Sequence, residues 1–156
     1  LGPGSYTGLR IAASVAKGYA FGAQVPILAI PTLDVLARAM VMALPGQNSP
    51  QDLLMPVMDA RRMEVYTATY SALGERLTPD TALVVHSADD LQGAWIGGDG
   101  SPKLAQAFGY GRVLGSLPMG AAFAQLALRY MREQKFADAT YLEPHYLKAF
   151  TPGLKA

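Results

Sequence analysis

Residues 1–22 read LGPGSYTGLRIAASVAKGYAFG, a glycine-rich turn that leads directly into a run of small and apolar residues. Glycine and proline set the backbone of a turn, and Ser5 or Thr7 can accept a hydrogen bond from the unpaired amides that open a helix. Residues four apart share one face of a helix. By that spacing small residues form two rows, Gly8/Ala12/Ala16/Ala20 and Ser14/Gly18/Gly22. The stretch therefore predicts a helix from about Tyr6 to Phe21 on which another element packs closely.

The turn before this helix has two interpretations. A helix start can hold an anion, which makes Gly4, Ser5 and Thr7 candidate ligand contacts. The stretch lacks the Lys-Ser/Thr ending of a Walker A loop and has no GxGxxG spacing, so we disfavour a nucleotide cradle there. The helix itself is either a core helix of this chain or part of a helix bundle between two chains. Periodicity alone favours the core helix.

Composition and charge indicate a globular protein and argue against strong nucleic-acid binding by this chain alone. The chain has 156 residues, 51% hydrophobic and 16% charged, which is typical of a globular protein. Thirteen Lys/Arg against twelve Asp/Glu leave a net charge of +1, with no basic run beyond Arg61-Arg62. Strong nucleic-acid binding by this chain alone is therefore not expected, and any contact with RNA would be shared with a partner.

Cysteine usage and hydropathy indicate where the protein works. No cysteine is present, which excludes disulfides and thiol catalysis and is typical of a reducing compartment, so we expect a cytoplasmic protein. No apolar stretch reaches the roughly 18 residues of a membrane span, and no membrane association is expected. The sequence starts at Leu1 without methionine, in what looks like the end of a strand, so we expect a protein whose N-terminal part is missing.

The pattern after Gly22 alternates strands and helices. Residues 25–30 form a short apolar run that suits a buried strand, and Thr32 is expected to cap a helix that continues to Leu44. A loop over 45–50 follows. Residues 53–58 and 64–70 then predict two adjacent strands around a turn at 59–62, with Pro56 at an edge or a bulge. This order predicts an α/β protein.

The second half of the sequence again predicts alternating strands and helices. Residues 82–86 predict a strand, and Ser87 is expected to cap a short helix. Residues 94–96 predict a further strand, followed by a glycine turn and a helix capped by Ser101. The helical period is clearest over 119–136. The proline-broken tail, residues 141–148, predicts a packed strand or loop.

The residues do not assemble an evident catalytic site. His86 and His145 have no second ligand at helical spacing, so no metal site is predicted, and Ser5 lacks the GxSxG context of a serine hydrolase. Asp59, Arg61 and Glu64 form the best polar group, interpreted either as acids that meet a partner or ligand or, as we favour for Asp59, as a turn with a local Asp–Arg pair. A second candidate ligand contact is the Gly97-Gly98 pair, which could equally be a tight strand-to-helix connection.

Several strings, taken in order, resemble the bacterial TsaB (YeaZ-type) family. They are Gly2-Pro3-Gly4-Ser5-Tyr6-Thr7-Gly8-Leu9-Arg10-Ile11, Ala16-Lys17-Gly18, Thr32-Leu33, Asp59-Ala60-Arg61, Glu64-Val65-Tyr66 and Glu143-Pro144-His145-Tyr146-Leu147. The first string is highly specific, and the set covers almost the whole chain. The resemblance implies an actin-like/Hsp70-like (ASKHA) two-lobe α/β fold. It also implies a division into the remainder of an incomplete N-terminal lobe (1–31), a C-terminal lobe (32–140) and a tail (141–156).

The resemblance further implies a role in making N6-threonylcarbamoyladenosine next to the anticodon of tRNA. The family member is a non-catalytic subunit that pairs with its paralogue TsaD, while TsaE joins as an ATPase. ATP and a metal ion then belong to the partners, no cofactor is expected on this chain, and tRNA is met only through the complex. The implied helix-bundle contact, with TsaD or with a second copy, uses the first helix; its expected interface residues are Tyr6, Leu9, Arg10, Ala12, Ala13, Ala16, Lys17 and Ala20. The alternative is an enzyme acting on its own, either an ATP-dependent transferase or an M22-type peptidase.

Overall fold

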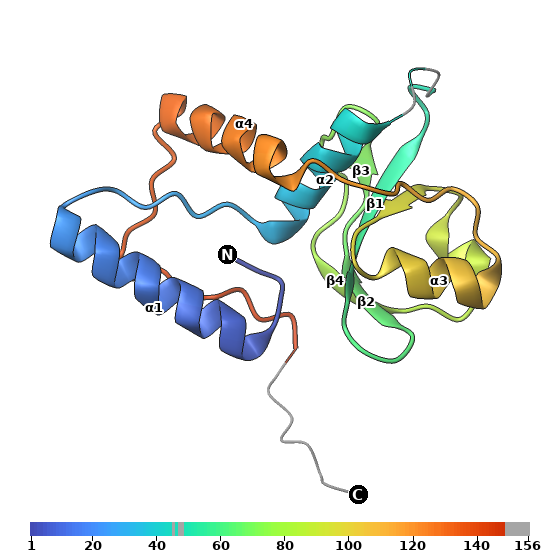
Figure 1. Cartoon of the computed structure of the whole chain (residues 1–156), viewed down its shortest axis with the longest axis horizontal. Coiled ribbons are helices and arrows are strands. Elements are labelled where there is room, and N and C mark those ends of the chain that lie inside the picture. Colours follow the sequence, from blue (N-terminus) through green and yellow to red (C-terminus); the bar gives the residue numbers. More distant parts are fainter. Residues whose placement is uncertain (45, 47–48, 149–156) are drawn as a thin grey trace, which may run out of the picture.

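The computed structural model describes residues 1–44, 46 and 49–148. Its elements are, in order, α1 (Tyr6–Ala23), α2 (Thr32–Ala43), β1 (Leu53–Asp59), β2 (Glu64–Thr67), β3 (Tyr70–Ser71), β4 (Thr81–Val84), the 3-10 helix η1 (Ala88–Leu91), β5 (Trp95–Gly97), α3 (Ser101–Phe108) and α4 (Met119–Arg132). Figure 1 shows a twisted sheet with α2 and α3 on opposite sides, and α1 and α4 extending away from it. Part of the predicted loop over 45–50, at positions 45, 47 and 48, lies outside the described residues.

The central strand of the sheet is β1. It pairs in parallel with β5 and antiparallel with β2 and β3, and β4 pairs antiparallel with β2. The register is the same for β2 and β3, with Val57 opposite Thr67 and Leu54 opposite Tyr70. Continuing it places Ala68 opposite Pro56, whose nitrogen has no hydrogen to donate. The predicted single strand over 64–70 is therefore split in two, and Pro56 lies in the central strand rather than at an edge.

Both faces of the sheet are buried. On the α3 side the core contains Val57, Val65, Ile96 and Leu104 with Leu91 of η1. The other side is covered by α2, whose Leu33, Ala37 and Met40 pack with Leu54 and Tyr70 of the sheet. A helix on each face of a mixed sheet confirms the predicted α/β class.

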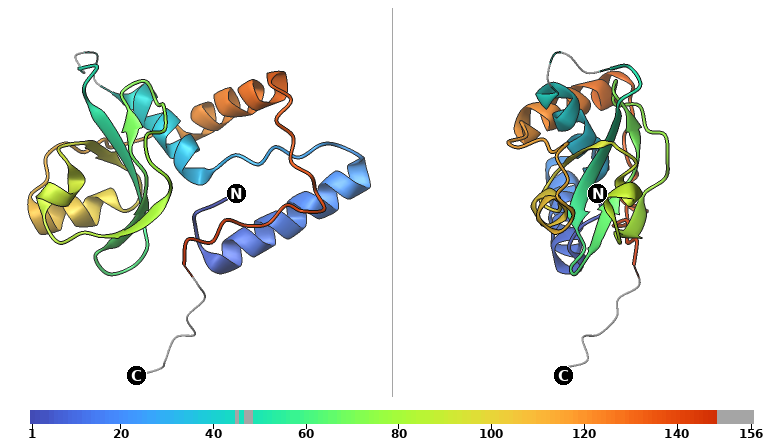
Figure 2. Two further views of the ribbon diagram at one scale, coloured as in Figure 1. Left: turned by 180° about the vertical axis from the view of Figure 1, so that it is seen from behind. Right: turned by 90° about the vertical axis from the view of Figure 1, so that its right-hand side faces the viewer.

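The α1 half of the molecule is built differently. Two extended segments belong to this half: in the left view of Figure 2, residues 25–31 cross between α1 and α4, and residues 137–147 come down from α4 and run along α1. The prediction of a strand over 25–30 is wrong in its extent, because only one bridge, between Ile27 and Ala137, joins these segments. The core here is small: Ala20, Ile27 and Leu142 form one cluster, and α4 packs separately on α2 through Ala122 and Leu126.

Several predicted helix boundaries are wrong for local reasons. Pro31, not Thr32, is the residue before α2, because the Thr32 hydroxyl accepts a hydrogen bond from the Gly2 amide instead of capping the helix. Ser101 is the first residue of α3 rather than its cap, and its hydroxyl donates to the Gly98 carbonyl at 2.8 Å. The last long helix ends at Arg132 rather than at 136. Ser87 does cap η1, in a capping box with Asp90.

Candidate functional site

The inner face of α1 packs on the chain itself. Ala20 is buried against Ile27 and Leu142. Leu9, Ala13, Ala16 and Lys17 are half-buried along the same side. Ala20, which we expected in an interface with another chain, therefore already has intramolecular neighbours, and the helix has a defined inner side.

The outward face of α1 has no cover within the described residues. We define it by five residues at helical spacing: Ile11, Val15, Gly18, Tyr19 and Gly22. The apolar side chains of this set are exposed to 59%, 65% and 72% for Ile11, Val15 and Tyr19. A Cβ added at Gly18 or Gly22 would meet no atom within 4 Å. Close packing against the described part of the chain therefore does not explain the two glycines, although each costs about 1 kcal/mol of helix stability relative to alanine.

The outward face includes residues that our expected interface left out. Of the expected residues, Ala12 is exposed beside this face, whereas Tyr6, Arg10 and Lys17 border a groove on the other side of the helix. The signal for the outward face was present in the sequence as the Gly18/Gly22 pair and the Ile11/Val15/Tyr19 row. Because small residues lie on both sides of the helix, the sequence pattern did not distinguish the side that faces the chain's own core from the outward face.

That groove lies between α1 and the tail. It has a volume of about 370 Å³ and is bordered by Arg10, Lys17, Glu143 and Tyr146. The rings of Tyr6 and Tyr146 are 4.7 Å apart between centroids. Lys17 Nζ lies 3.5 Å from the carbonyl oxygen of Thr140, and Arg10 Nη1 lies 3.2 Å from the Tyr6 hydroxyl. The Lys17–Thr140 hydrogen bond and the Tyr6–Tyr146 ring contact thereby attach residues 140–146 to the helix, whereas the Arg10–Tyr6 contact lies within α1.

The glycine turn before α1 is shaped by the tail and by its own helix. Gly2 has φ +129° and lies so close to the tail that an added Cβ would be 2.6 Å from the His145 carbonyl oxygen. Ser5 caps α1, its hydroxyl accepting from the Gly8 amide at 3.4 Å. Gly4 faces the Leu9 side chain, and Thr7 is exposed. The structure thus gives the turn an intramolecular role, and the predicted ligand contacts at Gly4, Ser5 and Thr7 stay a prediction.

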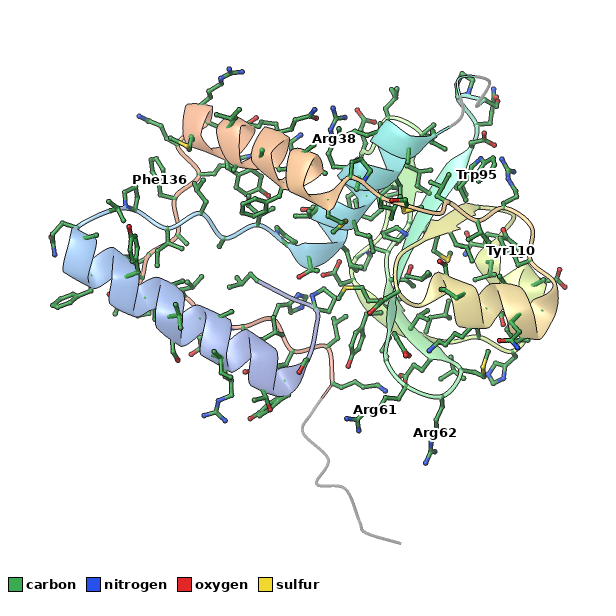
Figure 3. All side chains as sticks on the ribbon, in the orientation of Figure 1. Arg38, Arg61, Arg62, Trp95, Tyr110 and Phe136 are labelled. Carbon is green, nitrogen blue, oxygen red and sulfur yellow. The ribbon has the colours of Figure 1, made fainter. Side chains whose placement is uncertain are left out.

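Asp59 belongs to a second polar site, at the end of β1. Its Oδ1 accepts from the Arg61 amide at 2.8 Å and from Lys103 Nζ at 2.5 Å, while its own amide donates to Asp99 Oδ1 at 3.0 Å. The hydrogen bond from Lys103 is the main reason that the pKa of Asp59 lies below its usual value. The turn we favoured is present, but its ion-pair partner is Lys103 rather than Arg61. Arg61 and Arg62 point outward from the turn between β1 and β2 (Figure 3).

The Gly97–Gly100 turn is dictated by packing. A Cβ at Gly98, where φ is +121°, would lie 2.4 Å from the Val57 carbonyl oxygen, and one at Gly97 would lie 3.1 Å from Met40. A Cβ at Gly100 would lie 3.1 Å from Val65. These glycines let β5 and the start of α3 approach the central strand. Their predicted ligand contact stays a prediction.

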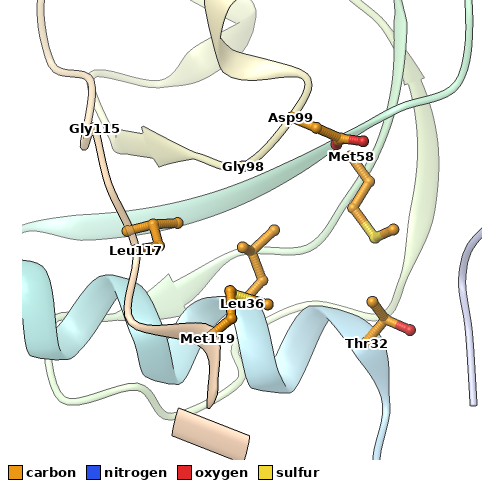
Figure 4. A pocket seen from close by; sticks show the side chains of 8 residues that line it. All are labelled: Thr32, Leu36, Met58, Gly98, Asp99, Gly115, Leu117 and Met119. Atoms are coloured by element: carbon orange, nitrogen blue, oxygen red, sulfur yellow. The ribbon is translucent and has the colours of Figure 1, made fainter. Parts of the chain in front are cut away.

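A largely apolar pocket of about 360 Å³ lies beside Gly98 (Figure 4). Leu36, Met58, Leu117 and Met119 supply most of its wall, with Thr32 and Asp99 at its polar side. Both polar side chains already have backbone partners, the amides of Gly2 and Asp59. The pocket therefore has room for an apolar group, but these contacts give no preference for a particular ligand.

The described part of the chain has neither a cluster of metal ligands nor a membrane-spanning helix. Residues 1–44, 46 and 49–148 contain no group of three His, Cys, Asp or Glu side chains placed to hold a metal ion. His86 is exposed, and His145 Nδ1 lies 3.4 Å from Asp80 Oδ2. No helix within these ranges has the length and hydropathy needed to cross a bilayer.

Comparison with known proteins gives a consistent picture. A family profile described as "TsaD: tRNA N6-adenosine threonylcarbamoyltransferase" matches residues 1–148. The chain is 30% identical to "tRNA threonylcarbamoyladenosine biosynthesis protein TsaB" of Escherichia coli, over 94% of this chain and 68% of that protein. It is 40% identical to the Bacillus subtilis protein of the same name, over 51% of this chain and 33% of that protein.

Solved structures agree with the sequence matches. "YeaZ from Pseudomonas aeruginosa" superposes with a TM-score of 0.69 at 26% identity, over 94% of this chain and 71% of that one. A second structure, described as "an uncharacterized protein with similarity to peptidase YEAZ from Pseudomonas aeruginosa", gives 0.70 at 28% identity, over 94% and 70%. The fold is thus the actin-like/Hsp70-like (ASKHA) α/β fold that the resemblance implied. The chain belongs to the family described as tRNA N6-adenosine threonylcarbamoyltransferase (TsaD) and, within it, to the TsaB/YeaZ-type proteins.

Proposed function

We propose that this chain is a non-catalytic subunit in the biosynthesis of N6-threonylcarbamoyladenosine in tRNA, and that it acts by docking a TsaD-type paralogue on α1. Support comes from its relatives in E. coli and B. subtilis, both named for this biosynthesis. A TsaE-type ATPase joins the complex, and ATP and the metal ion belong to the partner subunits. The chain works in the cytoplasm.

The outward face of α1 is the observation that carries the proposal. Three exposed apolar side chains lie beside two glycines with open space above them, so the backbone of a second helix can approach closely at Gly18 and Gly22. Burial of apolar area contributes about 25 cal/mol per Å², from which the cost of association is subtracted. A face of this kind stabilises a partner without touching the reacting groups.

RNA contact is assigned to the complex rather than to this chain. The net charge is only +1, and the exposed Arg61-Arg62 pair is the one basic run in the sequence. Affinity for a phosphate backbone comes mainly from clustered cations that neutralise phosphates and release their counterions. This chain therefore contributes to the tRNA reaction by supporting the subunit that holds the substrate.

The experiment that tests the proposal fills the open space on α1. Gly18→Leu places a large side chain where a partner helix would approach, and the structure has no intramolecular neighbour there to clash with. The matched control is Gly120→Leu, at a helical glycine of α4 that also has no atom within 4 Å of an added Cβ. We expect Gly18→Leu to lose co-purification with the TsaD-type paralogue while its circular dichroism and Tm match the control. Wild-type recovery of the paralogue by Gly18→Leu would refute the docking site.

Further measurements separate the alternatives. Depletion of this protein followed by nucleoside analysis should lower the threonylcarbamoyladenosine content of tRNA, which neither an unrelated transferase nor a peptidase predicts. Peptide hydrolysis or tight ATP binding by the purified chain would instead support an enzyme acting on its own. Sedimentation of the chain without the paralogue distinguishes a second copy on α1 from the heterologous partner.

A further inference from the structure

The turn between β1 and β2 holds two arginines in an unfavourable backbone conformation. Arg61 has φ +70° and Arg62 has φ +50°, both in the left-handed region that is uncommon for residues with a side chain. Where two successive turn residues need a positive φ, Asn-Gly or Gly-Gly is the usual solution. Non-glycine residues in such conformations cluster at functional sites. The shape of the turn therefore does not explain why both positions are arginine.

Hydrogen bonds fix the turn in this conformation. The Ala60 amide donates to the Glu64 carbonyl oxygen at 3.1 Å, and the Arg61 amide donates to Asp59 Oδ1 at 2.8 Å. Lys103 Nζ, from α3, lies 2.5 Å from Asp59 Oδ1 and 2.7 Å from the Glu64 carbonyl oxygen. The backbone beneath the two arginines is thus held from both strands and from the helix.

The carboxylates around the turn already have cationic partners. Asp59 pairs with Lys103, and Glu64 pairs with Lys148 of the tail. Arg61 adds only a minor attraction to Asp59. Both guanidinium groups are exposed, point away from the sheet (Figure 3) and form no hydrogen bond or ion pair with the described residues. Two adjacent positive charges are therefore left for an external anion.

The residue types at the turn favour phosphate groups as that anion. A guanidinium donates two parallel hydrogen bonds to phosphate oxygens. Residues 59–63 contain no aromatic ring on which a base could stack, so the turn is suited to a nucleic-acid backbone and not to its bases. Carboxylates of an acidic protein could also pair with arginine. The function proposed above brings tRNA to the complex, and tRNA carries a phosphate at every nucleotide.

We propose that Arg61 and Arg62 contact adjacent phosphates of the tRNA backbone when tRNA is bound to the complex. This inference rests on the proposed function, because the paralogue subunit supplies most of the affinity for RNA. It concerns a turn at the edge of the sheet, whereas docking uses α1. Two phosphate contacts are too few for strong binding by this chain alone, in agreement with its net charge of +1.

The test measures binding of an unmodified tRNA transcript to the complex with the TsaD-type paralogue at several salt concentrations. Arg61→Gln/Arg62→Gln removes both charges. Arg129→Gln/Arg132→Gln, on α4, changes the net charge equally and is the matched control. We expect the turn variant to bind at least about tenfold more weakly, with a slope of log K against log salt reduced by roughly 0.7–0.9 for each lost phosphate contact. The control should keep the wild-type affinity and slope.

Two further variants separate charge from backbone conformation. Arg61→Lys/Arg62→Lys retains both charges and should retain the salt slope. Arg61→Asn/Arg62→Gly suits the left-handed backbone and should raise Tm by about 2–4 °C, while it loses as much RNA affinity as the glutamine variant. A turn with a structural role alone would gain the same Tm without any change in RNA binding.

Recovery of the paralogue is measured for every variant, so that docking and RNA contact are tested separately. Wild-type affinity and salt slope in Arg61→Gln/Arg62→Gln would show that the RNA contact is wrong although docking stands. Loss of the paralogue by this variant would mean that the arginines bind an acidic protein surface, which overturns the proposal. If the wild-type chain recovers no paralogue, the proposed function fails. The titrations are then made on the chain alone at about 50 mM salt, where equal RNA binding by the wild-type chain and the glutamine variant would also overturn the RNA contact.

Discussion

The Tyr70 hydroxyl donates a 2.8 Å hydrogen bond to Asp34 Oδ1 and so joins β3 to the first turn of α2. Arg76 Nη2 lies 2.6 Å from the same oxygen, and the guanidinium lies 5.0 Å from the centroid of the Tyr70 ring. Arg76 also pairs with Asp80, which His145 of the tail approaches at 3.4 Å. One polar cluster thus connects the sheet, α2 and the tail. Burial and the nearby Asp34 charge raise the pKa of Tyr70, so the phenol stays protonated as the donor.

Removal of the Tyr70 hydroxyl should measure the strength of this connection. Tyr70→Phe keeps the buried ring but leaves Asp34 with Arg76 as its side-chain partner. A hydrogen bond to a charged group is typically worth about 1.5–3 kcal/mol, and we expect a loss of that order in the free energy of unfolding from urea titration. The same change at Tyr141, which is 81% exposed, should cost nothing measurable. Equal losses at the two positions would show that the Asp34 contact does not stabilise the fold.

The lowered pKa of Asp59 predicts how the stability of the fold depends on pH. Its pKa is lowered in the folded chain, mainly by Lys103, so the folded state binds this proton less readily than the unfolded state does. The contribution is therefore present above the unfolded value, about pH 4, and is lost as pH falls through the lower folded value. Asp59→Asn should flatten the decline of Tm below about pH 4 relative to the wild-type chain. If Tm fell equally with decreasing pH in the wild-type and Asp59→Asn chains, the role of the Asp59–Lys103 pair would be contradicted.

The glycine turn after β5 gives a prediction that separates packing from ligand binding. Gly98→Ala would bring Cβ to 2.4 Å from the Val57 carbonyl oxygen at φ +121°, so the backbone must shift. We expect a loss of more than about 3 kcal/mol, or insoluble protein, by comparison with typical single-residue effects. Gly109→Ala has a left-handed φ of +62° but open space around it, and should cost about 1 kcal/mol. A Gly98→Ala chain as stable as Gly109→Ala would mean that packing does not explain this glycine.

Local patterns in the sequence were sufficient for the helices but not for the strand pairing. The small-residue and apolar rows placed α1, and the apolar spacing placed α2 and α4, because each pattern repeats within a few residues of the chain. The break between β2 and β3 depends on Pro56 of the neighbouring strand, which no pattern within 64–70 reveals. The position of Pro56 in the central strand likewise depends on β5, about 40 residues further on.

The candidate sites were predictable to different degrees. Helical spacing predicted the helix but favoured a core position for it, and the interface role came from the family resemblance. The row Gly8, Ala12, Ala16 and Ala20 suggested one packing side as strongly as Gly18 and Gly22 suggested another. The tail and residues 27–29 decide between them, and these contacts are distant in sequence. Lys103, the ion partner of Asp59, is 44 residues away and was not foreseen.

The small core under α1 gives the last prediction. Leu142 of the tail is 7% exposed, and it packs with Ala20 and Ile27 in a cluster separate from the two cores of the sheet. Leu142→Ala should therefore loosen α1 while the sheet keeps its stability. For a buried leucine the cost is about 2–5 kcal/mol, and the lower end is expected here because the site can collapse.

Native-state hydrogen exchange followed residue by residue is the measurement that checks this. A loss of about 2 kcal/mol in local opening corresponds to roughly thirtyfold faster exchange of α1 amides, with amides of β1 unchanged. Leu128→Ala, at a position of α4 that is 53% exposed, is the control and should leave α1 protected. Uniform acceleration in α1 and β1 would show instead that the two halves unfold as one unit. In that case the whole sheet rather than the tail would stabilise α1, and the tail contact would have no separate part in the docking that we propose for this helix.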